Sequence, residues 1–242
     1  GQRNAEWCGH GPILEEDLAL ANNALDLIGQ ARLLYQHVAA LRQDGSDEDS
    51  LAYWRDAHEF KNHTLLELPH STALAPTARG DRDYAVTIVR NFLYSSFMVL
   101  VWDALQHATD AQLAAIASKS RKEALYHVQH AQDWLIRFGD GTAESHARAQ
   151  AALNHLMPYT QSFWLLGEDE AAALQDAGVA HFSSLLSAWQ TQVASAVSEA
   201  TLTLPTAAGH VPEGHLGRHS EHLGFLLAEM QSLARAHPGG SW

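Results

Sequence analysis

The chain has 242 residues, of which 46% are hydrophobic, enough to fill the core of one large domain or two small ones. Its 28 acidic side chains outnumber its 15 Lys and Arg residues, and the formal net charge is -13. An acidic chain repels phosphate backbones, which argues against nucleic-acid binding. The single cysteine, Cys8, excludes an internal disulfide. Since no signal-peptide pattern is visible either, the sequence predicts a cytoplasmic protein.

The first half of the chain is predicted to form three helices. Residues 13–42 carry acidic side chains in the first turn and then an apolar stripe at three- and four-residue steps. The stripe consists of Leu14, Leu18, Ala21, Leu25, Ile28, Ala31, Tyr35 and Val38. A second helix is predicted over residues 50–68, ended by Pro69. Residues 81–107 form a third, whose apolar run is interrupted by polar residues, so we expect a buried core helix and no membrane span.

Capping signals continue in the second half. Asp110 is predicted to cap a helix that Gly139 ends, with an inward face formed by Ala124, Tyr126, His127, Gln129, His130 and Trp134.

Shorter helices follow this long one. Thr142 begins a helix to about residue 166, kinked by Pro158, and residues 168–176 form a short helix closed by Gly178. Ser183 or Ser184 is expected to cap a helix to about residue 201. A last helix follows over residues 215–237. No segment alternates with period two, so the prediction is an all-α bundle of long antiparallel helices.

Such bundles can hold a di-iron centre, with a Glu from each of two helices and a Glu-x-x-His motif from each of two others. The sequence contains this motif literally only at Glu67-Leu68-Pro69-His70, where the proline lies at a predicted helix end, so we interpret it as a chance match. In two near matches the Glu and the His are four residues apart: Glu123 with His127, and Glu59 with His63. A third lies in the last predicted helix, where His215, His219 and His222 stand beside Glu221. Each is explained more simply as a hydrogen-bonded pair on a helix surface.

Several runs of sequence resemble the C-subunit (PaaC) family of the bacterial phenylacetyl-CoA epoxidase complex. They include Glu6-Trp7-Cys8-Gly9-His10-Gly11-Pro12, Leu25-Asp26-Leu27-Ile28-Gly29-Gln30-Ala31-Arg32 and Glu221-His222-Leu223-Gly224. The likeness spans essentially the whole chain. It implies one ferritin-like helical domain over residues 1–242, with its N-terminal helix truncated. It also implies a structural subunit that pairs with a catalytic di-iron A subunit in aerobic phenylacetate catabolism, alongside a small B subunit and a reductase.

The chain departs from the catalytic relatives at their metal ligands. Where those have Asp-Glu-x-x-His, this chain has Asp26-Leu27-Ile28-Gly29-Gln30. Where they have Glu-Glu-x-x-His, it has Glu123-Ala124-Leu125-Tyr126-His127. Leu27, Gln30 and Ala124 therefore replace a glutamate, a histidine and a glutamate. Two iron ions need anionic oxygens to offset their charge, so we expect no metal, no cofactor and no catalytic residue in this chain.

Two other functions remain open. One is an independent helical metalloenzyme whose reorganised site uses Asp26, Glu59, His63, Glu123 and His127. The other is a helical acyl-CoA binding module, for which a cavity lined by Trp or Phe with a basic rim is the expected signature. If the chain is instead the structural subunit, we expect a metal-free polar cluster formed by Asp26, Gln30, Glu123 and His127, because buried polar groups need hydrogen-bond partners.

Overall fold

The structure is a computed structural model, and it describes residues 1–74, 82–206 and 211–240. Within these ranges the chain is helical and contains no β-strand, which confirms the predicted all-α class and fits a ferritin-like bundle. The α-helices are α1 (Gln2–Ala5), α2 (Leu14–Arg42), α3 (Tyr84–Leu105), α4 (Ala111–Gly139), α5 (Ala143–Leu156), α6 (Glu168–Asp176), α7 (Leu186–Glu199) and α8 (Glu221–Ala236).

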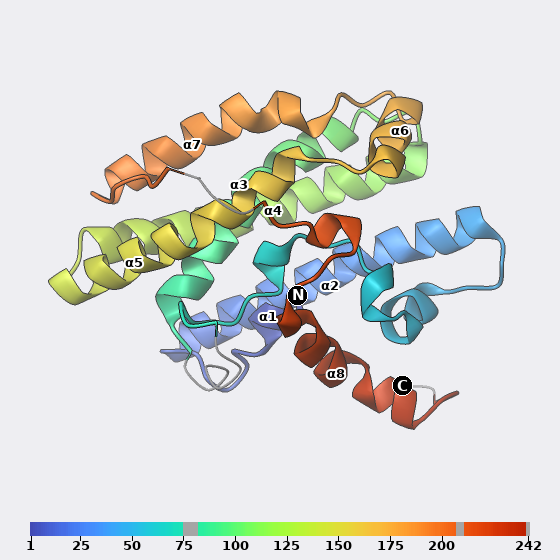
Figure 1. Cartoon of the computed structure of the whole chain (residues 1–242), viewed down its shortest axis with the longest axis horizontal. Helices are drawn as coiled ribbons and strands as arrows, with labels where there is room; N and C mark the ends of the chain where they lie inside the picture. The colour runs from blue at the N-terminus through green and yellow to red at the C-terminus, as the bar shows by residue number, and fades with distance from the viewer. Residues whose placement is uncertain (75–81, 207–210, 241–242) are drawn as a thin grey trace.

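Helix α3 lies at the centre of the fold, packed along its length against α4 (Figure 1). Side chains with no exposed surface, such as Ile88, Phe92 and Leu93, fill the space between α3 and its neighbours. Length and composition alone would allow α3 to cross a membrane, but 72% of its most apolar window is buried within the protein. This burial fits the predicted core helix.

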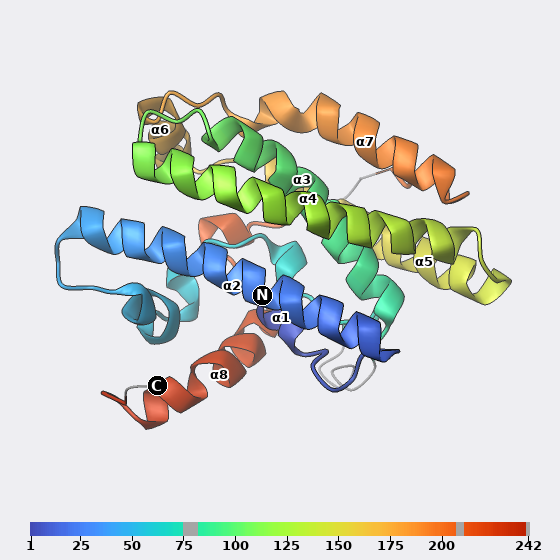
Figure 2. The same ribbon diagram turned by 180° about the vertical axis from the view of Figure 1, so that it is seen from behind.

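Helix α2 packs against the other side of α4, and both lie at the front in Figure 2. Helices α5 and α7 pack against α3 and α4 at the opposite side, whereas α8 contacts the short turns that follow α2. The seam between α2 and α4 contains the residues that the sequence singled out as former ligand positions.

Several local signals are confirmed. The Asp110 side chain accepts hydrogen bonds from the backbone N–H groups of Gln112 and Leu113 and so caps α4. Thr142 caps α5 by accepting from the backbone N–H of Ser145. Gly178 adopts φ +67° just beyond α6, the left-handed conformation that ends a helix.

The predicted helix over residues 50–68 is wrong. The segment forms one π-helical turn, Ser50–Trp54, and two 3-10 turns, Ala57–Glu59 and Thr64–Leu66. Side chains from elsewhere take the carbonyl groups that a helix would use: the Gln231 amide donates to the carbonyls of Ala52 and Arg55. Tertiary contacts therefore outweigh the helical pattern of this segment.

Two other predictions need correction at helix ends. The α-helix stops at Leu156, before Pro158, and the chain continues as a 3-10 helix over Met157–Trp164, because proline lacks the amide that an α-helix needs. Neither Ser183 nor Ser184 caps α7: a 3-10 turn, Phe182–Leu185, leads directly into it, and the His181 ring caps that turn by accepting from the backbone N–H of Ser183.

The last helix begins later than predicted, at Glu221. His215 belongs to a separate 3-10 turn, and Gly217 behind it adopts φ +85°. A side chain at this glycine would meet the carbonyl oxygen of His58 at 2.9 Å. The left-handed turn breaks the helix, so the four residues His215, His219, Glu221 and His222 do not share one helical face.

Candidate functional site

Polar side chains join α2 to α4 along their antiparallel seam. Four pairs cross it in order: Glu16 with His130 at 2.8 Å, Asp26 with His127 at 3.0 Å, Gln30 with Glu123 at 2.9 Å, and His37 with Asp110 at 2.7 Å. The residue numbers rise on α2 as they fall on α4, as antiparallel packing requires. A seam held by hydrogen bonds differs from the apolar helix contact that amphipathic patterns usually predict.

The structure brings together the four residues of the predicted polar cluster as two neighbouring pairs. His127 is 4% exposed and its Nε2 contacts a carboxylate oxygen of Asp26. The Gln30 amide, 6% exposed, donates to a carboxylate oxygen of Glu123. Lys119 adds a weaker contact to Glu123 from one turn away, at 3.6 Å. The four polar groups are thus hydrogen-bonded as two pairs across the seam.

Burial lowers the pKa of His127 below its usual value, while the hydrogen bond and the negative charge of Asp26 oppose that shift. A histidine with a lowered pKa is neutral near pH 7 and carries one ring N–H. Nε2 is the nitrogen that faces the Asp26 carboxylate, so this N–H donates to Asp26. The Nε2 atom is therefore already engaged by Asp26.

The side chains of Leu27 and Ala124, where the resemblance predicts lost metal ligands, contain only carbon atoms. Ala124 is 2% exposed and packs in the core, and Leu27 is half-buried. The anionic groups nearby, Asp26 and Glu123, are each hydrogen-bonded to a partner across the seam. Across residues 1–74, 82–206 and 211–240, no three His, Cys, Asp or Glu side chains are grouped closely enough to hold a metal ion. This donor set does not fit a di-iron centre.

Sequence comparison gives a family for this chain. The family model described as "Phenylacetic acid catabolic protein" matches residues 1–242. The chain belongs to this family. One curated relative, the C subunit of 1,2-phenylacetyl-CoA epoxidase from Escherichia coli (strain K12), is 40% identical over 241 residues, which cover 100% of this chain and 92% of the relative. The resemblance predicted from the sequence runs is confirmed.

The residues of the other candidate sites make structural contacts. Glu59 and His63, predicted to lie one turn apart on a helix, sit in different turns. Glu59 accepts from the backbone N–H of Asp56, while His63 contacts the Ser162 hydroxyl at 3.1 Å and the ring of Phe163 edge-on. The reorganised site that required Glu59 and His63 beside His127 is not assembled.

Glu67 and His70, the literal Glu-x-x-His match, are both buried but serve separate networks. The Glu67 carboxylate accepts from Asn62, His219 and Ser220, and thereby ties the start of α8 to the body of the protein. The Nδ1 atom of His70 lies 2.7 Å from an Arg90 guanidinium nitrogen. These contacts give both side chains a structural role.

Two features of the seam escaped prediction. Tyr126 and Gln129, expected on the inward face of α4, are exposed. Glu16, which the sequence suggested as a favourable first-turn charge, is instead buried and accepts a 2.5 Å hydrogen bond from the Tyr84 hydroxyl. Burial opposes ionisation of Glu16, but hydrogen bonds from Tyr84 and His130 lower its pKa below the usual value.

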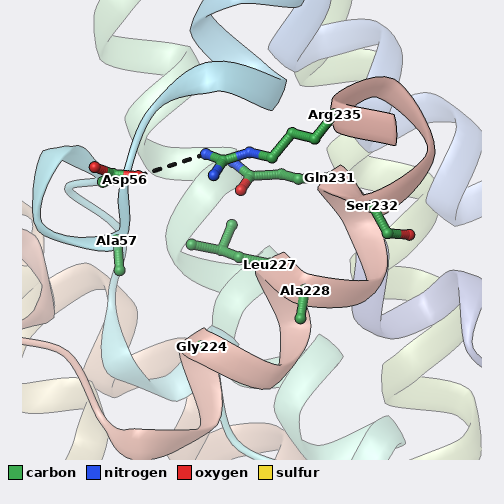
Figure 3. Close-up of a pocket in the computed structure, with 8 residues that line it drawn as sticks. All are labelled: Asp56, Ala57, Gly224, Leu227, Ala228, Gln231, Ser232 and Arg235. Atoms are coloured by element: carbon green, nitrogen blue, oxygen red, sulfur yellow. Dashed lines mark ion pairs between the residues drawn. The ribbon is translucent and has the colours of Figure 1, made fainter. Parts of the chain in front are cut away.

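An open groove of about 290 Å³ lies between α8 and the turn at Asp56, as Figure 3 shows. Its lining consists of Asp56, Ala57, Gly224, Leu227, Ala228, Gln231, Ser232 and Arg235. The one arginine is directed to Asp56, at 3.6 Å. The groove therefore lacks both the aromatic walls and the basic rim expected of an acyl-CoA cavity.

Proposed function

We propose that this chain is a non-catalytic subunit of a phenylacetyl-CoA epoxidase complex in phenylacetate catabolism. In this role it pairs with a ferritin-like catalytic subunit that carries the di-iron centre. A small B subunit and a reductase complete the complex, which acts in the cytoplasm, and the chain works as one ferritin-like domain. The full-length likeness to the epoxidase C subunit from Escherichia coli supports this assignment.

The observation that carries the proposal is the seam between α2 and α4. A catalytic ferritin-like subunit needs carboxylates and histidines aimed between its helices. Here Leu27 and Ala124 stand at two of those positions, and the nearby polar groups are bonded to each other. Metal binding would require breaking two hydrogen bonds and would still lack carboxylates at Leu27 and Ala124, so the seam favours a packing role.

Metal analysis of the chain, alone and with its catalytic partner, tests this role. The chain purified alone should contain iron no higher than a buffer-treated control protein, and it should not oxidise phenylacetyl-CoA when supplied with the reductase. Mixed with the catalytic subunit, it should elute as one complex on size exclusion. The iron of that complex should match the amount of catalytic subunit. Stoichiometric iron in the isolated chain, or failure to form the complex, would overturn the proposal.

Measurements on the isolated chain also distinguish this role from the two alternative functions. An independent metalloenzyme predicts tight iron binding that is lost on His127→Ala. An acyl-CoA module predicts saturable binding of phenylacetyl-CoA to the isolated chain in calorimetry. The role proposed here predicts neither, because the described residues provide no grouped metal donors and the groove beside α8 has no aromatic lining.

A further inference from the structure

Helix α2 exposes the face that its sequence pattern marks as apolar. Four large side chains of this face are open to solvent: Leu14 is 71% exposed, Leu18 55%, Leu25 68% and Ile28 49%. Their spacing of four, seven and three residues puts them in one line along the helix. We call these four residues the α2 stripe. Figure 2 shows α2 at the surface of the molecule, with α4 beside it.

The opposite face of α2 is the one that packs inward, and it carries polar groups. Glu16, Asn23 and Gln30 are buried, at 8%, 2% and 6% exposure. Glu16 accepts from His130 of α4 and Gln30 donates to Glu123 of α4, so α2 cannot rotate to bury its leucines without breaking these hydrogen bonds. The seam therefore holds the stripe outward.

Helix α4 adds one exposed aromatic side chain near α2. Tyr126 is 55% exposed, and its ring stacks on His130 with centroids 6.3 Å apart. Since His130 is bonded to Glu16, Tyr126 lies beside the first half of α2. A line of large exposed apolar side chains, such as the α2 stripe, is typical of a protein interaction site.

Charges around the stripe indicate what covers it. Its rim is acidic around the first half of α2, with Glu15 exposed and Asp17 and Asp26 half-buried, and the exposed Arg32 beyond its far end is already paired with Glu48 at 3.1 Å. If a second copy covered the stripe, the two α2 helices would meet in a symmetric contact centred on Ala21. In an antiparallel contact, Asp26 of one copy would lie opposite the turn of Asp17 in the other. In a parallel contact, each acidic residue would lie opposite its own counterpart, so like charges would meet in both arrangements. The net charge of -13 adds to this repulsion. A different chain with basic flanking residues fits better.

We propose that the α2 stripe, with Tyr126, docks an apolar helix face of another polypeptide that is flanked by Lys or Arg. This inference rests on the proposed function for the identity of the partner, which is the catalytic subunit of the complex. The hydrogen-bonded seam between α2 and α4 then has a second role, because it keeps the stripe exposed for that partner. Hydrophobic contact supplies the affinity, and the acidic rim supplies the choice of partner.

Charge substitutions in the stripe test the proposal. Leu18→Glu and Leu25→Glu each place a carboxylate within the contact, and Leu233→Glu is the matched control on α8, where the leucine is 56% exposed. Affinity for the purified catalytic subunit is measured by calorimetry, with circular dichroism to confirm the fold. The stripe variants should bind at least about tenfold more weakly than wild type, whereas Leu233→Glu should bind as wild type does. If all three bind equally, the docking surface is refuted and the proposed function still stands.

Glu15→Lys tests the acidic rim, because Glu15 is exposed and outside the apolar line. The variant should bind the catalytic subunit more weakly than wild type. Its affinity should also fall less than that of wild type when the salt concentration is raised. Unchanged salt dependence would refute a basic partner surface. No complex with wild type would overturn both the proposed function and this inference.

Two other occupants give distinct results in the chain studied alone. Concentration-dependent dimers in sedimentation, abolished by Leu25→Glu, would identify a second copy and overturn the proposal. A Leu25→Cys thiol that reacts with a maleimide as slowly as a buried thiol in the monomeric chain, with no change when the catalytic subunit is added, would identify a segment of the same chain and overturn it too. A thiol that reacts fast in the chain alone and more slowly once that subunit is added is the result expected.

Discussion

The Nε2 atom of His127 lies 3.0 Å from a carboxylate oxygen of Asp26, and this contact joins α4 to α2 where related catalytic subunits are expected to hold metal. The contact makes the retained histidine a hydrogen-bond donor. Its neighbours Leu27 and Ala124 bring no charge to the seam. Variants of these residues and of the buried groups around them test how far such contacts explain the stability and the chemistry of the chain.

Removing the Asp26 charge should change the titration of His127. Burial lowers the pKa of this ring and Asp26 opposes that effect, so Asp26→Asn should lower the pKa further. NMR of the imidazole protons measures it. The variant should also lose about 1 kcal/mol of stability in urea, typical of one hydrogen bond. Asp133→Asn, on the exposed face of α4, is the control and should leave the His127 titration unchanged. An unaltered pKa in Asp26→Asn would contradict the contact.

Restoring ligands should restore metal affinity. The triple variant Leu27→Glu, Gln30→His, Ala124→Glu adds two carboxylates and an imidazole to the seam, and carboxylates offset the charge of bound iron. We expect its iron content after anaerobic loading to rise above that of wild type. The matched control, Leu27→Gln with Gln30→His and Ala124→Gln, has similar side-chain sizes but no added charge. Equal iron in both variants would mean that charge is not the missing factor.

Stability should fall as the pH drops below 6.5. Burial lowers the pKa of His63 and of His70 to about 4 in the folded state. Unfolded histidine has a pKa of about 6.5, so between these values the unfolded chain binds more protons and acid favours unfolding. The free energy of unfolding should drop between about pH 6.5 and pH 4, by up to about 3 kcal/mol for each histidine.

Denaturant titrations at several pH values measure this dependence. His63→Phe keeps a ring beside Phe163 but removes one titrating group, so its free energy of unfolding should change less with pH than that of wild type. His10→Gln, which alters an exposed ring, is the control and should follow wild type. Stability that stays constant from pH 7 to pH 4.5 would show that the buried histidines do not take up protons on unfolding.

Tyr84→Phe should destabilise the packing of α2 on α3. The Tyr84 hydroxyl donates to the buried Glu16 carboxylate at 2.5 Å, and hydrogen bonds to charged groups contribute about 1.5–3 kcal/mol. Thermal and urea unfolding should show a loss in this range. Tyr126→Phe removes an equivalent hydroxyl from an exposed tyrosine and should cost little. Similar losses in both variants would argue against a special role of the buried contact.

The sequence by itself determined the helices with strong local signals. Asp110, Thr142 and Gly178 act through their own neighbouring backbone groups, so their caps and stops are predictable without the rest of the chain. The missing ligands are equally local, because Leu27 and Ala124 lack carboxylates in any fold. The all-α class and the family resemblance followed from the same kind of information.

Only the tertiary structure decided which faces and segments are used. Residues 50–68 have a helical pattern, yet Gln231, from almost the other end of the chain, takes their carbonyl groups. Helical periodicity identifies the stripe containing Leu18 and Leu25 but does not say whether it points to the core or to solvent. Its direction was set by the seam: Glu16 and Gln30 are buried against α4, and their hydrogen bonds hold the apolar face of α2 outward.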